Sequence, residues 1–310
     1  MWLYCLKRIL ATIPILIGLT LIVFFIMAMI PGEPAQALLG PWATPENVAR
    51  VKTEPLYQQY FIWMNNLISG DFGRSFVLNR PVVDEVLERF SATLILGGSA
   101  LLLSSILGLL AGVLSAIRQF SWSDRFITLA VLLGISMPSF WIGLLMIMLF
   151  SVQLQWFPAS GMYDIWQGGG LSDLLHHLVL PAVTLSLVAT GVIARLTRTA
   201  MLEVLRLDFI RTARAKGLSE RKVIFRHAFR MALVSVIPVI GIQAGFVFGG
   251  AVYIETVFQW PGLGAMLVKA VATRDLFLVQ GGVLIAAASY VFINLLADVA
   301  QAILDPRLKS

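Results

Sequence analysis

Residues 232–254 read ALVSVIPVIGIQAGFVFGGAVYI and contain no Asp, Glu, Lys or Arg. A helix needs about 20 consecutive apolar residues to cross the hydrocarbon core of a bilayer, which is about 30 Å thick. This stretch is long and apolar enough to cross. Because hydrocarbon offers the backbone no hydrogen-bond partners, we expect the stretch to be helical.

Five more stretches of this kind occur along the chain, at 9–30, 93–117, 126–152, 178–194 and 276–297. The composition agrees with this interpretation, since 58% of the 310 residues are hydrophobic and only 13% are charged. A soluble protein of this composition would have too few polar residues to cover its surface. We therefore predict an all-α polytopic membrane protein with six transmembrane helices. The first stretch is longer than a usual signal-peptide core, so we expect it to be retained.

The charges are distributed unevenly between the two sides of the membrane. If the N-terminus is cytoplasmic, the cytoplasmic segments are 1–8, 118–125, 195–231 and 298–310, and they hold 16 of the 23 basic residues but only 6 of the 17 acidic ones. The positive-inside rule favours this orientation, with both termini in the cytoplasm. The excess of basic residues that gives the net charge of +6 thus lies in the cytoplasmic segments. We therefore expect membrane lipid rather than nucleic acid as a partner.

The predicted spans divide the chain into three parts. Residues 1–30 form an N-terminal tail and the first transmembrane helix, and 31–92 form a small external, periplasmic-side subdomain. Residues 93–310 form a five-helix core, in which 195–231 is the only substantial cytoplasmic loop. We expect function to reside mainly in the two long loops.

The sequence gives little sign of catalysis or of metal binding. A P-loop requires a lysine directly after a glycine, and no lysine of this chain follows one. The three histidines form no H-E-x-x-H pair, and GISMP at 134–138 lacks the final glycine of a nucleophile elbow. We expect no catalytic residue, no metal and no cofactor bound by this chain. A metal or proton site, or an intramembrane enzyme, at His176 and His177 is the alternative.

The cytoplasmic loop contains a basic segment, 207–220, that reads LDFIRTARAKGLSE. Asp208 suits the N-terminal end of a short helix, Arg214 and Lys216 suit its C-terminal end, and Gly217 is a natural residue to end it. The side chains that could enter a groove of another protein are Phe209, Ile210, Ala213, Ala215 and Leu218. These residue types leave open whether the helix binds anionic lipid or a partner protein.

The string ARAKGL at 213–218, followed by RHAFR at 226–230 and by Pro238, resembles the EAA-type loop of ABC importer permeases. The form is that of the dipeptide, oligopeptide and nickel branch. Further stretches similar to this family occur in order along nearly the whole chain: PGEPA at 31–35, GDFGRS at 70–75, SMPSF at 136–140, WFP at 156–158, ETVF at 255–258 and WPGLG at 260–264. One departure is RVKTE at 50–54, where the family pattern is longer.

The resemblance implies one half of the translocation pathway of an ATP-driven importer in a bacterial inner membrane. The cargo would be dipeptides, oligopeptides or a related small molecule such as glutathione or a nickel chelate. The implied partners are a second, probably different permease chain, two ATPase subunits that bind ATP and Mg, and an extracytoplasmic substrate-binding protein. The implied ATPase-docking, or coupling, helix carries Asp208, Arg211, Ala213, Arg214, Ala215, Lys216, Gly217 and Leu218.

Few polar residues fall inside the predicted spans, and no ionisable residue lies near a span centre. Ser136 and Gln243 are the candidates for the pathway, with Glu255 and Trp260 near an outer gate. A self-sufficient secondary transporter or channel is the alternative function, although a proton-coupled mechanism usually needs a buried titrating group.

Glycines recur at spacings that allow close helix packing. Gly241, Gly245 and Gly249 form one small-xxx-small stripe, and Gly108 and Gly112 form a second pair in another span. Pro138 lies within the span 126–152, where its missing N–H favours a kink.

Overall fold

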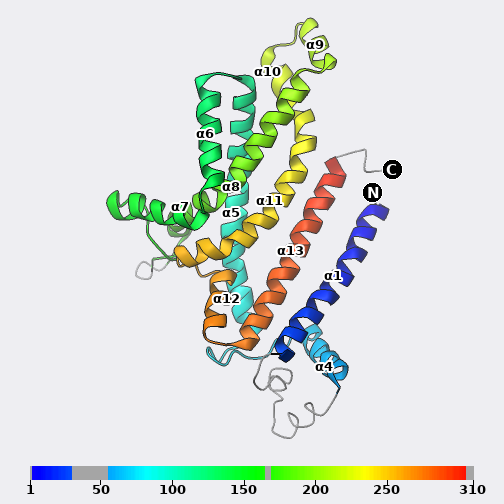
Figure 1. The fold of residues 1–310 in the computed structure, drawn as a ribbon, viewed down its shortest axis with the longest axis vertical. Helices are drawn as coiled ribbons and strands as arrows, with labels where there is room; N and C mark the ends of the chain where they lie inside the picture. The colour runs from blue at the N-terminus through cyan, green and yellow to red at the C-terminus, as the bar shows by residue number, and fades with distance from the viewer. Residues whose placement is uncertain (1, 30–54, 165–168, 305–310) are drawn as a thin grey trace. The chain divides into compact units, whose positions relative to one another are not determined.

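The computed structural model describes residues 2–29, 55–164 and 169–304, and the regular structure in these ranges is helical (Figure 1). The prediction of an all-α fold is confirmed. In chain order, the helices are α1 (Trp2–Met29), α4 (Leu56–Ile68), α5 (Val82–Ile117), α6 (Trp122–Ser136), α7 (Ser139–Met146), the π-helical η2 (Ile147–Gln153), α8 (Leu171–Leu205), α9 (Asp208–Ala215), α10 (Glu220–Lys222), the π-helical η3 (Val223–Ala228), α11 (Phe229–Val257), α12 (Leu263–Ala272) and α13 (Leu276–Leu304).

Part of the predicted external subdomain at 31–92 is described, from residue 55 onward. The stretches 31–35 and 50–54, which carry one family motif and the departure from the family pattern, lie outside the described residues. The predicted extent of this subdomain therefore stays a prediction.

Four helical segments of the described chain are long and apolar enough to cross a membrane, namely Val82–Ile117, Leu171–Leu205, Glu220–Val257 and Leu276–Leu296. A fifth span results if α6 and the helix after it count as one bent span. The apolar part of α1, Leu10–Ile26, is a shorter helix. These findings support a polytopic membrane protein, and the count of six spans stays a prediction.

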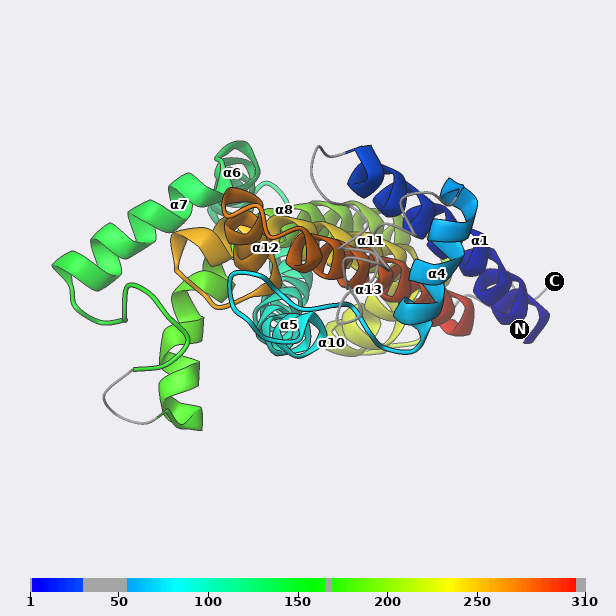
Figure 2. The same cartoon turned by 90° about the horizontal axis from the view of Figure 1, so that it is seen from below.

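The kink expected at Pro138 is a complete break. α6 ends at Ser136, the next helix begins at Ser139, and the two axes differ by 108°. Proline lacks an N–H and disfavours helical geometry at the preceding residue, and Met137 is accordingly extended, with φ −94° and ψ 138°. Figures 1 and 2 both show α7 running away from the end of α6.

The described residues form two compact units, the first built mainly from 94–260 and the second from 6–93 together with 261–292. In the first unit, α8 packs against α6, α7 and α11. One of its clusters of buried residues joins α5, α8, α9, η3 and α11 and comprises Val113, Ala116, Ile193, Ala200, Met201, Val204, Ile210, Ala213, Val223, Ala228, Ala232 and Val236. α8 is therefore the helix around which this unit is organised.

The glycine pair in α5 lies directly against α8. A Cβ atom on Gly108 would lie 2.7 Å from Cβ of Ile193, and one on Gly112 would lie 2.5 Å from Cβ of Thr197 and 2.6 Å from the carbonyl oxygen of Ala194. Real side chains do not come this close. The predicted close packing at Gly108 and Gly112 is confirmed, and only glycine fits there without movement.

The second unit is fixed by a buried carboxylate. Asp275 lies just before α13, where its side chain accepts hydrogen bonds from Leu278 N at 3.2 Å, from Val77 N at 3.2 Å and from the Ser75 hydroxyl. The carboxylate thus caps α13 and holds the 75–77 loop against it. Two clusters of buried residues also hold this unit together: one joins α1, α4 and α13 through Phe24, Trp63 and Leu284, and the other joins α5, α12 and α13 through Val82, Leu263 and Phe277.

Replacing Gly112 tests the close approach of α5 and α8. Gly112→Ala is expected to lower the unfolding temperature of the detergent-solubilised chain, because overpacking typically costs about 1–3 kcal/mol. Gly98→Ala, on the same helix, is the matched control, since no described atom lies within 4 Å of a Cβ at that position. It should be neutral or slightly stabilising, because alanine favours helix over glycine. Equal unfolding temperatures for the two variants would contradict the packing described above.

Candidate functional site

The predicted short helix in the long loop is present as α9 (Asp208–Ala215). Asp208 lies in its first turn and Arg214 in its last, as the helix dipole favours. Gly217 follows with φ +76°, its N–H bonds to the carbonyl of Arg214 at 2.9 Å, and Leu218 N bonds to the carbonyl of Ala213 at 3.4 Å. This pair of bonds is the Schellman arrangement, so the glycine ends the helix as predicted.

One face of α9 is buried within the chain. Ile210 and Ala213, three residues apart, lie in the same cluster as Met201 and Val204 of α8. Two sequence-based interpretations are therefore wrong: Ile210 is not an exposed anchor, and the side chain of Ala213 does not belong to an outer surface. The i, i+3 spacing places both on one side of α9, and this helix packs against η3.

The other face of α9 is exposed and carries both apolar and charged groups. Phe209 is 41% exposed and Leu218 is 37% exposed. Arg214 binds the Glu220 carboxylate through Nε at 2.8 Å and Nη2 at 3.3 Å, which ties the end of α9 to α10. The remaining predicted docking residues, all exposed, are Asp208, Arg211, Ala215, Lys216 and Gly217. The Arg211–Asp208 contact of 3.4 Å is surface-exposed and adds little stability.

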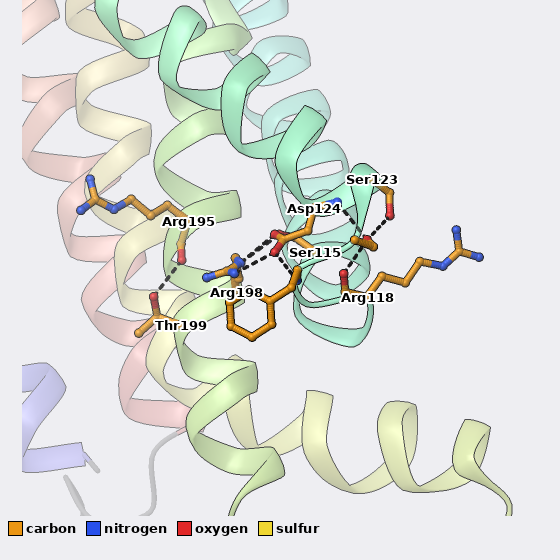
Figure 3. A network of polar contacts seen from close by, with 9 residues as sticks. Ser115, Arg118, Ser123, Asp124, Arg195, Arg198 and Thr199 are labelled. Carbon is orange, nitrogen blue, oxygen red and sulfur yellow. Dashed lines mark hydrogen bonds and ion pairs between the residues drawn. The ribbon is translucent and has the colours of Figure 1, made fainter.

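A buried polar network joins α8 to the α5–α6 hairpin (Figure 3). Arg198 of α8 donates from Nε and Nη2 to the two carboxylate oxygens of Asp124, both at 3.0 Å. Its Nε also lies 3.0 Å from the hydroxyl of Ser115 in α5, which itself donates to Asp124. Ser115 and Asp124 are almost completely buried, so three helices share one ion pair.

The same carboxylate shapes the turn between α5 and α6. Asp124 accepts a hydrogen bond from Phe120 N at 2.9 Å, while its own N–H donates to the hydroxyl of Ser121, the N-cap of α6, at 3.2 Å. In the sequence, Asp124 and Arg198 are only two of the charges in the predicted cytoplasmic segments 118–125 and 195–231. A capping-box pattern, Ser121 followed three residues later by Asp124, could have predicted the start of α6, but nothing local indicates the partner on α8.

One stretch of α8 carries all of these contacts. Ala194 and Thr197 lie against Gly112, Arg198 binds Asp124, and further along the helix Met201 and Val204 lie in the cluster that contains the inner face of α9. The same stretch of α8 thus contacts α5, binds Asp124 and belongs to the buried cluster that contains the inner face of α9.

The predicted pathway residues do not gather in one place. Ser136 is the exposed last residue of α6, and Gln243 is buried in α11. Glu255 lies on α11 too, 12 residues later and hence about 18 Å along the axis. Trp260 follows the helix, with its N–H bonded to the carbonyl of Glu255 at 2.8 Å.

The surroundings of Glu255 differ from the prediction. The span was expected to end at Ile254 and leave Glu255 in an external loop, but α11 continues to Val257. Both Glu255 and Trp260 are completely buried. The carboxylate is therefore part of the protein interior, because the helix extends beyond the apolar stretch from which its end was predicted.

The glycines of α11 differ from one another in their surroundings. Gly245 is buried and Gly241 is half-buried, whereas Gly249 is exposed, with no described atom within 4 Å of a Cβ placed on it. A packing role for this stripe stays a prediction.

His176 and His177 have nearby partners within the chain. Nε2 of His176 lies 2.8 Å from the carbonyl oxygen of Trp156, and Nδ1 of His177 lies 3.1 Å from the Asp173 carboxylate. Among the described residues, no three His, Cys, Asp or Glu side chains are grouped so as to hold a metal ion.

Family comparisons match nearly the whole length of the chain. Residues 108–310 match the family described as binding-protein-dependent transport system inner membrane component. Residues 1–97 match the N-terminal region described for a binding-protein-dependent transport system membrane component.

Three relatives align over nearly their full length. The dipeptide transport system permease protein of Alkalihalophilus pseudofirmus is 38% identical, with 99% of each chain covered. The di/tripeptide transport system permease protein of Pseudomonas aeruginosa is 41% identical, with 98% of this chain and 97% of that protein covered. The glutathione transport system permease protein of Escherichia coli is 39% identical, with 99% and 98% covered.

Solved structures with a similar fold are membrane transporters as well. An inward-facing methionine ABC transporter matches with a TM-score of 0.57 at 20% identity, over 71% of this chain and 96% of that one. An amino acid ABC transporter matches with a TM-score of 0.52 at 14% identity, over 72% and 94%. The resemblance found in the sequence is thus confirmed, and the chain belongs to the family of binding-protein-dependent transport system inner membrane components.

Proposed function

We propose that this chain is a permease subunit of an ATP-driven ABC importer whose cargo is a dipeptide or a related small peptide such as glutathione. The observation that carries the proposal is the 38–41% identity, over nearly the full length, to permeases named for dipeptides, di/tripeptides and glutathione. The sequence contains no P-loop lysine, which agrees with ATP and Mg being bound by other subunits.

The proposed assembly has four further components: a second permease, probably a different chain, two ATPase subunits and an extracytoplasmic substrate-binding protein. The N- and C-termini of this chain lie in the cytoplasm of a bacterial cell, as the basic segments favour. On this side, the exposed face of α9 contacts an ATPase subunit. Phe209 and Leu218 are the apolar anchors, and Arg211 and Lys216 supply positive charge around them.

The contacts of α8 suggest how the ATPase moves the pathway. Because α9 packs against η3, and Ile210 and Ala213 share a buried cluster with Met201 and Val204, a displacement of α9 reaches α8 through this cluster. The Arg198–Asp124 pair then carries the displacement to α5 and α6. In this mechanism α9 receives the force, and the three helices joined by the ion pair respond as one body.

Reconstitution tests the proposed function. Proteoliposomes that contain this chain, its partner permease, the ATPases and the binding protein are expected to accumulate a labelled dipeptide or glutathione only when ATP is supplied. Proteoliposomes with this chain alone should show no uptake above protein-free vesicles. Uptake by the chain alone would instead support a self-sufficient transporter or channel.

The docking face is tested by removing its apolar anchors. The double variant Phe209→Ala with Leu218→Ala is expected to lower the amount of ATPase that co-purifies with the permease by about tenfold or more, since buried anchors often contribute 1–2 kcal/mol each. Leu171→Ala, an exposed leucine at the other end of α8, is the matched control and should leave co-purification unchanged. Unchanged ATPase binding in the double variant would contradict docking through α9.

The polar network is tested by separating hydrolysis from transport. Loss of a partner in a buried ion pair costs about 3–5 kcal/mol, so Asp124→Asn is compared with the milder Ser115→Ala. Both are expected to retain bound ATPase but to transport less cargo per ATP hydrolysed, with Ser115→Ala the smaller effect. Thr199→Ala, which removes an exposed hydroxyl bonded to the Arg195 carbonyl, is the control on the same helix (Figure 3). A purely structural role would lower protein yield and leave the transport-to-hydrolysis ratio constant.

A further inference from the structure

The turn between α5 and α6 exposes three large aromatic side chains. Phe120 is 77% exposed, Trp122 is 84% exposed and Phe126 is 72% exposed. Two exposed arginines, Arg118 and Arg125, lie among them, and the guanidinium carbon of Arg125 is 5.4 Å from the centre of the Trp122 ring. Aromatic groups alternate here with cations on a surface that the rest of the described chain leaves uncovered.

The backbone of this turn is held in place by hydrogen bonds. Phe120 has φ +63°, a left-handed conformation that a bulky side chain rarely adopts and that costs of the order of 1–3 kcal/mol. The Phe120 N–H donates to the Asp124 carboxylate at 2.9 Å, and the same carboxylate accepts hydrogen bonds from Arg198 and Ser115. The network therefore fixes a strained turn in the position that presents its aromatic groups outward.

The exposed surface continues along the apolar faces of both helices. On α6, Trp122, Phe126, Leu129 and Leu133 are exposed at i, i+4, i+7 and i+11. They form a stripe about 16 Å long. On α5, Ile106, Leu110, Leu114 and Ile117 are exposed as well. Such stripes on spans suit acyl chains, whereas a water-soluble partner bound at the turn could not follow them into the membrane.

The charge at the turn selects the kind of lipid. Among the described residues, neither Arg118 nor Arg125 forms an ion pair with a carboxylate. The nearby carboxylate, that of Asp124, is bound to Arg198. Aromatic rings and arginines are the groups that proteins place at the headgroup level of a bilayer.

We propose that the α5–α6 turn is a binding site for an anionic phospholipid, whose phosphate contacts Arg118 and Arg125 while its acyl chains lie along the apolar stripe of α6. The site anchors the end of the hairpin that Asp124 ties to α8. This proposal rests on the turn itself and does not depend on the identity of the cargo.

Quenching of Trp122 fluorescence by brominated lipids tests the proposal. The full chain is reconstituted in phosphatidylcholine vesicles that contain a minor fraction of brominated phosphatidylglycerol or, in parallel, brominated phosphatidylcholine. Because the chain has eight tryptophans, the Trp122 signal is taken as the difference from the Trp122→Phe variant. We expect phosphatidylglycerol to quench this signal at concentrations about fivefold or more below those of phosphatidylcholine.

The double variant Arg118→Gln with Arg125→Gln should abolish the lipid preference, and the double Lys variant at the same positions should retain it. Arg221→Gln with Lys222→Gln removes the same charge from α10 and is the matched control, which should keep the preference. Equal quenching by the two lipids in the parent chain, or a preference that survives the double Gln variant, would overturn the proposal. Protection of Trp122 from both lipids would do so too, because it would show that protein covers the turn.

Discussion

The carboxylate of Asp124 is buried among three helices, and an isolated charge in such a place would be strongly destabilising. It is stable there because Arg198 binds both of its oxygens, Ser115 donates to one of them and Phe120 N donates to the other. These bonds connect the α5–α6 hairpin to α8. The strained turn between α5 and α6 depends on this ion pair, because Asp124 holds the Phe120 N–H.

The stiffness of the arrangement comes from packing as well as charge. The approach of α5 to α8 at Gly112 leaves no room for even a methyl group, and Ile210 on the other side is completely enclosed. Close-packed contacts of this kind do not deform gradually, so elements joined by them tend to move as a body. A short exposed helix can act as a lever only when its inner face is held this firmly, which agrees with the proposed role of α9.

Local patterns in the sequence were sufficient to predict the all-α fold and the short helix 208–215 with its end at Gly217, because both depend on residues within a few turns. The small-xxx-small spacing also indicated close packing at Gly112, although it did not indicate that the partner is α8. The pairing of Asp124 with Arg198 was not predictable, since the two are 74 positions apart. The inward face of α9 and the burial of Glu255 were missed for the same reason: burial depends on which neighbour an element packs against. Pro138 indicated a bend, but the angle between α6 and α7 depends on the packing of α7 against α8 and α11.

The distribution of ionisable groups bears on how such a chain can work. In the segments 93–117, 178–194 and 232–254, which lie within α5, α8 and α11, the sequence has no Asp, Glu, Lys or Arg. A proton-driven carrier requires a group that changes charge within the membrane, whereas a permease moved by an ATPase requires only that force be transmitted between helices. Two ion pairs of the first unit lie where that force would enter: Arg198–Asp124 at the α5–α6 turn and Arg214–Glu220 at the end of α9. Placing the ion pairs at the helix ends leaves the apolar interior free to rearrange without exposing a charge to lipid.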